Sequence, residues 1–278
     1  MMKLSVSMWS LDRVIQENGW SQLAFLDWAK KAGFEYVELV SYYMNNENNL
    51  IEVVKKLQEL NLRVSCYTIL NDFSTGTDEA WNYYLKDLEA AVKLKAPFVR
   101  VLTGGEDAGN AAEKAIILEG FKKAAIEGEK HNIIMVLENV GVHSTHSNDV
   151  YEIVSAVDSP QFRVNFDTAN ALLADEKPID ALIKLQPLTA YVHFKDFITD
   201  SSDNYSAVIS RDAGREQVSF NGKKMTGITA GEGEVPLTEM ISLLKKSGYE
   251  GFISQEYEGT GKSGEDTIKS LEYLKSIL

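Results

Sequence analysis

Cysteine is nearly absent from this chain, which has 278 residues and a single cysteine, Cys66. An intrachain disulfide is therefore excluded. Cys66 lies in an apolar run, where a cysteine usually serves as a small buried hydrophobic side chain. Basic residues are also scarce, with 28 against 41 acidic residues and a net charge of −13. No cluster of Lys and Arg suited to a phosphate backbone is visible, so we expect neither nucleic acid nor an anionic membrane as a partner.

Long apolar runs are also missing. The first residues, MMKLSVSMWSLDRV, reach polar and charged side chains within a few positions and do not form the apolar core of a signal peptide. No stretch elsewhere is long enough to span a bilayer. We therefore expect a protein that stays where it is made, in the cytoplasm.

Short apolar runs rich in strand-forming residues recur along the chain, and amphipathic stretches separate most of them. Several runs are apolar on both faces, which is typical of buried parallel strands. Eight strands alternating with helices predict an α/β fold, the (β/α)₈ TIM barrel, and a doubly wound sheet is the main alternative. No GxGxxG follows the first strand, which argues against a dinucleotide fold. The expected strands are 4–8, 36–40, 63–68, 98–103, 133–138, 162–167, 190–194 and 251–256.

One interval between strands is too long. The last two expected strands begin 61 residues apart, whereas the other intervals are 27 to 35 residues. The excess, about 196–230, contains Asn221-Gly222 between two alternating stretches, a strong hairpin signal. We predict a β-hairpin insertion after strand seven, at the rim where barrel active sites lie. No low-complexity linker divides the chain, so residues 1–278 are expected to form one domain.

Four metal-competent residues close successive expected strands. They are Glu138, Asp167, His193 and Glu256. Singly, each has an ordinary explanation, such as a helix cap or a buried histidine. In a barrel, however, the ends of strands five to eight converge on one mouth. Three carboxylates and one imidazole suit one divalent ion, Mn²⁺, Mg²⁺, Co²⁺ or Zn²⁺, which would also relieve the repulsion between the carboxylates.

The chain resembles the xylose-isomerase-like barrel superfamily, whose members include ketose 3-epimerases, hydroxypyruvate isomerases and inosose dehydratases. The resemblance covers nearly the whole chain. It implies that Glu138, Asp167, His193 and Glu256 bind one divalent ion. It also implies that Glu138 and Glu256 are the catalytic acid/base pair. The matching motifs are AGFEYVEL (32–39), LENVG (137–141), FDTAN (166–170), VHFKD (192–196), GEGEV (231–235) and GYEGFISQEYEG (248–259).

The implied reaction is isomerisation or epimerisation of a small sugar or keto-polyol. A metal would stabilise the enediolate, while one glutamate removes the proton next to the ketone and the other returns it. Asn170 stands where ketose 3-epimerases usually carry a substrate-binding histidine. Lys195 lies just beyond the expected strand 190–194, and it can contact substrate oxygens or act as an acid/base group if the strand ends there. The candidate substrate contacts are Asn170, Lys195, His143, Glu38, Trp9 and Arg215.

Three other functions remain open. The first is a metal-dependent dehydratase of a keto-cyclitol such as inosose, which begins with the same proton abstraction. The second is a non-catalytic sugar-binding barrel. The third is the activity of the related DNA-repair endonucleases. These enzymes use additional strand-end histidines, which the runs RVSCYT and FVRVLT lack, so this function is disfavoured. The sequence also leaves open which sugar is the substrate, which metal is native and whether the chain forms a homo-oligomer.

Overall fold

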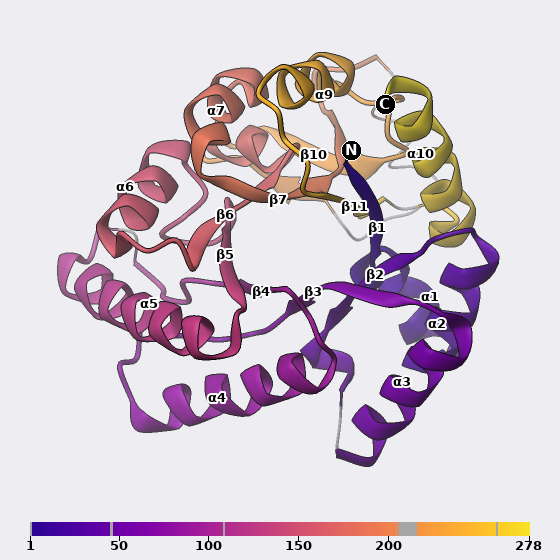
Figure 1. Cartoon of the computed structure of the whole chain (residues 1–278). Helices are drawn as coiled ribbons and strands as arrows, with labels where there is room; N and C mark the ends of the chain where they lie inside the picture. The colour runs from indigo at the N-terminus through magenta and orange to yellow at the C-terminus, as the bar shows by residue number, and fades with distance from the viewer. Residues whose placement is uncertain (1, 45–46, 108, 204, 206–215, 260) are drawn as a thin grey trace.

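The computed structural model is a closed barrel of eight parallel strands surrounded by helices (Figure 1). It describes residues 2–44, 47–107, 109–203, 205, 216–259 and 261–278. The predicted (β/α)₈ fold is confirmed, because β1 pairs with both β2 and β11 and so closes the sheet. The barrel strands are β1 (Lys3–Ser7), β2 (Tyr36–Val40), β3 (Arg63–Thr68), β4 (Phe98–Val101), β5 (Ile134–Glu138), β6 (Phe162–Asp167), β7 (Thr189–Phe194) and β11 (Phe252–Gln255).

Helices cover the outside of the barrel. Side-chain caps begin several of them: Ser21 accepts a hydrogen bond from Ala24 N, and Thr77 accepts one from Ala80 N. Among the described residues, no helix is long and apolar enough to cross a membrane. The helices are α1 (Asp12–Asn18), α2 (Gln22–Lys31), α3 (Glu47–Leu60), α4 (Asp78–Lys93), α5 (Ala111–His131), α6 (Ser147–Val157), α7 (Pro178–Leu185), α9 (Leu237–Lys246) and α10 (Ser263–Ile277).

Apolar residues on both faces of the strands build the core. One face packs against the helices, and the other fills the barrel interior. Inside the barrel, Cys66, Val136, Tyr191 and Phe252 form a separate buried cluster. Cys66 is fully buried and free, as its apolar sequence context predicts.

The predicted hairpin after β7 is present. Strands β9 (Gln217–Val218) and β10 (Lys224–Ile228) are antiparallel, and β8 (Asp196–Thr199) adds a third strand on the other side of β10. The turn places Gly222 at φ 83°, with its N–H bonded to the Ser219 carbonyl. A three-residue hairpin loop that ends in a left-handed glycine has this geometry. Arg215 lies outside the described residues.

Candidate metal and active site

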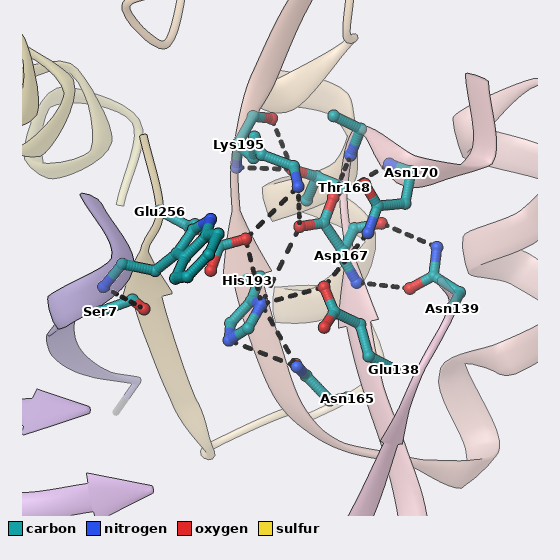
Figure 2. A network of polar contacts seen from close by, with 12 residues as sticks. Ser7, Glu138, Asn139, Asn165, Asp167, Thr168, Asn170, His193, Lys195 and Glu256 are labelled. Atoms are coloured by element: carbon teal, nitrogen blue, oxygen red, sulfur yellow. Dashed lines mark hydrogen bonds and ion pairs between the residues drawn. The ribbon is translucent and has the colours of Figure 1, made fainter. Parts of the chain in front are cut away.

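The four predicted strand-end residues come together at the carboxyl end of the barrel (Figure 2). Glu138 and Asp167 end β5 and β6, His193 is the penultimate residue of β7, and Glu256 follows β11 directly. The register pairs Asp167 with His193 across adjacent strands. One ligand atom from each of the four side chains lies within 4.8 Å of the others, and all four residues are buried.

His193 lies at the centre of this cluster. Its Nδ1 atom is 3.2 Å from Glu138 Oε1, 3.5 Å from Glu256 Oε2 and 3.9 Å from Asp167 Oδ2. One nitrogen of the ring therefore faces all three carboxylates. This set of one imidazole and three carboxylates could hold a single divalent ion.

The hydrogen bonds of the carboxylates fit such an ion. Asp167 Oδ1 accepts from the backbone N–H groups of Ala169 and Asn170, so this residue caps the turn after β6 as well as facing the cluster. Asp167 Oδ2 and Glu138 Oε2 are buried and accept no hydrogen bond, but each lies in an ion pair, with Lys195 and Arg100 respectively. Buried polar atoms are normally hydrogen-bonded or bound to an ion. Both oxygens therefore already face a positive charge, which is the kind of partner that a metal ion would also supply.

Without a bound ion, burial of the cluster disfavours the charged form of its carboxylates. Burial raises the pKa of Glu256 to about 7, against the opposing charges of His193 and Lys195. Burial also raises the pKa of Asp167. Burial acts on Glu138 in the same direction, but Arg100 and His193 hold the pKa of this carboxyl below its usual value. A cation at the centre would favour the charged form of every carboxylate.

Lys195 directly follows β7 and reaches the cluster. Its Nζ atom lies 3.1 Å from Asp167 Oδ2, 3.3 Å from Glu256 Oε2 and 2.9 Å from Glu258 Oε2. Its spacing of two residues from His193 places both side chains on the same side of an extended segment, and β7 itself stops at Phe194. The ammonium group therefore lies inside the mouth of the barrel.

A cavity of about 310 Å³ opens above the cluster. Trp9 and Gln217 form part of its wall, and both hold Glu258: Trp9 Nε1 donates to Oε1 at 2.8 Å, and Gln217 Nε2 donates to Oε2 at 3.1 Å. Gln217 belongs to the hairpin insertion, which thus contributes directly to the mouth. A cavity of this volume matches the small-molecule sites of enzymes.

The other predicted contacts divide into two groups. Asn170 lines the cavity, with Nδ2 3.1 Å from Glu138 Oε1 and a buried Oδ1 that has no hydrogen bond. Glu38 also lines the cavity, but its oxygens bond to other side chains. His143 is not among the lining residues; it is buried, with Nε2 2.5 Å from Glu113 Oε2. The structure therefore does not bring His143 to the mouth.

Sequence reasoning missed Arg100 and Glu258. Arg100 lies within β4, lines the cavity and forms an ion pair with Glu138. A charged residue inside the apolar run FVRVLT was the available signal, because such a residue is rarely buried without a partner. For Glu258, the signal was its position two residues after Glu256, which places both side chains on one side of an extended segment.

The fold and the cluster agree with the comparisons. Residues 26–277 match the family model described as xylose isomerase-like TIM barrel, and the chain belongs to this family. An inosose dehydratase of Clostridium botulinum is 23% identical over 172 residues, 60% of this chain; the matched part spans 55% of that protein, about half its length.

Solved structures show the same fold. The probable 3-DHS dehydratase of Bacillus anthracis superposes with a TM-score of 0.76 at 18% identity, covering 99% of both chains. A D-tagatose 3-epimerase-like protein gives 0.74 at 19% identity, covering 99% of this chain and 97% of its own. The proteins similar to this chain thus include two named dehydratases and an epimerase-like protein.

Proposed function

We propose that this protein is a divalent-metal-dependent isomerase or epimerase of a small, uncharged sugar or keto-polyol. The observation that carries the proposal is the buried group of Glu138, Asp167, His193 and Glu256, of which Glu138 and Glu256 line a cavity of about 310 Å³. These four side chains would hold the ion. Once bound, a dication supplies Lewis-acid polarisation of a ketone oxygen.

The protein's own residues would then move the proton. A hydrogen next to a ketone is weakly acidic, and a nearby carboxylate can remove it to leave an enediolate. We assign this role to Glu138 and Glu256, one removing the proton and the other returning it to the same or the neighbouring carbon. Burial raises the pKa of Glu256 to about 7 when no ion is bound, and a bound dication would lower this pKa and favour the carboxylate, the form that removes a proton.

The charges around the cavity support an uncharged substrate. Five carboxylates, those of Glu38, Glu138, Asp167, Glu256 and Glu258, surround the site. Among the described lining residues the only basic side chains are Arg100 and Lys195, and both already lie against carboxylates. A dication leaves this site negative, so a phosphate or carboxylate on the substrate would be repelled.

A second candidate is a dehydratase acting on a keto-cyclitol. Lys195 favours it, because its Nζ lies in the mouth 3.3 Å from Glu256 Oε2. After a carboxylate takes the proton next to the ketone, the carbon–oxygen bond at the adjacent carbon would break. Lys195 would protonate the departing hydroxide to water, and a carbon–carbon double bond would form. This product is a conjugated enone, which absorbs in the ultraviolet.

The test is a panel of ketoses and keto-inositols, assayed in D₂O with the metal restored. We expect deuterium at the carbon next to the ketone in the product. Glu138→Gln and Glu256→Gln should each lower turnover by about 10²–10⁴-fold. Metal content is measured beside each rate, and Glu265→Gln, an exposed glutamate on α10, is the matched control. An enone product would select the dehydratase, whereas binding with no turnover of any substrate would select a sugar-binding barrel.

A further inference from the structure

Glu38 makes a contact that its place in the sequence did not predict. It lies within β2, is 1% exposed, and reaches across the barrel interior to the imidazole of His193. Its two oxygens lie 3.1 and 3.0 Å from His193 Nε2. Both oxygens also accept hydrogen bonds from other side chains, so Glu38 is bound on the protein side rather than free to meet a substrate.

The two ring nitrogens of His193 therefore face different partners. Nδ1 faces the three carboxylates of the candidate metal site, and Nε2 faces Glu38. A neutral imidazole carries one N–H and one lone pair. A hydrogen bond from Nε2–H to the Glu38 carboxylate leaves the lone pair on Nδ1, the nitrogen that faces the site.

Asn165 does not change the preference of His193 for the tautomer that is protonated on Nε2. Its Nδ2 lies 3.3 Å from both ring nitrogens, so it is no closer to one than to the other (Figure 2). Asn165 therefore does not select one tautomer. Among the described contacts of Nε2, the carboxylate of Glu38 is the charged acceptor.

Glu38 is itself held in place. Thr68 Oγ1 donates to Oε1 at 2.7 Å, and the Tyr191 hydroxyl donates to Oε2 at 3.1 Å. The Tyr191 hydroxyl lies 2.8 Å from Ser65 Oγ, which lies 2.6 Å from Ser5 Oγ. This buried chain of hydroxyls runs into the barrel interior and fixes the carboxylate, and through it the plane of the imidazole.

We propose that Glu38 is a positioning residue for the metal: it orients His193 and sets the tautomer that presents Nδ1 to the ion. The proposal rests on the metal-binding part of the proposed function and on no particular substrate. Partners that orient a metal-bound histidine typically contribute 10–100-fold to metal affinity. An amide is a weaker acceptor than a carboxylate, so Glu38→Gln should weaken binding of Mn²⁺ by about 10–100-fold.

Calorimetric titration of the metal-free protein with Mn²⁺ tests this without any substrate. Glu258→Gln is the control, because it removes one negative charge from the same cavity but does not contact His193. We expect Glu38→Gln to lose more affinity than Glu258→Gln. Equal losses would overturn the proposal and leave a general effect of charge. If the unaltered protein binds no divalent ion, the proposed function itself fails.

A second readout separates positioning from simple destabilisation. In the ¹⁵N spectrum of the zinc-loaded protein, Nε2 of His193 should appear protonated, and Glu38→Gln should shift its resonance. Should Glu38→Gln not fold, Thr68→Val and Tyr191→Phe keep the carboxylate but release it. Each should then weaken Mn²⁺ binding by a smaller factor. An unchanged Nε2 resonance, or unchanged affinity in these two variants, would refute the role.

Discussion

Replacing Arg100 with methionine removes the guanidinium group that lies against Glu138 inside the barrel mouth. Glu138 is 1% exposed, so its carboxylate would remain buried without its main counter-charge. Removing one partner of a buried ion pair costs about 3–5 kcal/mol. Glu138 keeps Asn170 Nδ2 at 3.1 Å and His193 Nδ1 at 3.2 Å, which favours the lower end, about 3 kcal/mol.

Urea unfolding in the presence of a chelator measures this loss, by linear extrapolation of the free energy of unfolding. The double variant Arg100→Met/Glu138→Gln should recover most of it, because a neutral pair leaves no uncompensated charge. Adding Mn²⁺ should stabilise Arg100→Met more than the unaltered protein, since the ion replaces the missing positive charge. An equal gain from the metal in both proteins, or a double variant no more stable than Arg100→Met, would refute this reasoning.

Gly227 lies against the backbone of Glu258, where a Cβ would come within 2.4 Å of the Glu258 carbonyl carbon. Gly227→Ala should therefore lower the free energy of unfolding, measured by urea denaturation, by about 1–3 kcal/mol. Gly264→Ala in α10, which has room for the methyl group, should instead be neutral or stabilising. Burial raises the pKa of Asp87 in the folded protein. The protonated carboxyl therefore contributes fully to the free energy of unfolding below the unfolded pKa of about 3.9, and this contribution is lost as the pH rises through the folded pKa. Asp87→Asn should accordingly raise Tm at pH 7 and leave it unchanged near pH 3, as scanning calorimetry would record; a gain at both pH values would contradict this. Gln217→Ala should raise KM and leave kcat and Mn²⁺ affinity nearly unchanged, because it alters only the part of the cavity wall that the hairpin provides. Steady-state kinetics and metal titration test this, and a large change in kcat or in Mn²⁺ affinity would contradict it.

The fold was predictable because the barrel repeats one simple pattern. Strands buried on both faces appear as apolar runs, and β2, β3 and β6 have the limits that these runs predict. The four-residue cluster followed from the same regularity, since residues that end parallel strands must meet at one rim. The hairpin was predictable from its excess length and from Asn221-Gly222.

The partners of buried charges were not predictable. Arg100 meets Glu138, and Glu38 meets His193, because the strands have a particular stagger that alternation does not specify. The place of His143 depends on Glu113 in α5, a helix whose rotation about its axis the sequence leaves open. These contacts join residues from separate βα units, whereas the patterns read from the sequence are local to one unit.

The arrangement of the mouth separates two tasks. The four candidate metal donors lie at strand ends, where backbone pairing holds them rigidly, and in the proposed function they would serve the first proton abstraction of an isomerase and of a dehydratase alike. The cavity is also lined by Lys195, Glu258 and Gln217, which lie on segments that follow the strands or on the hairpin. We infer that these outer groups, rather than the four donors, decide between returning a proton and expelling hydroxide. Substitutions at Lys195 should change which product forms, whereas substitutions at the four donors should abolish both reactions.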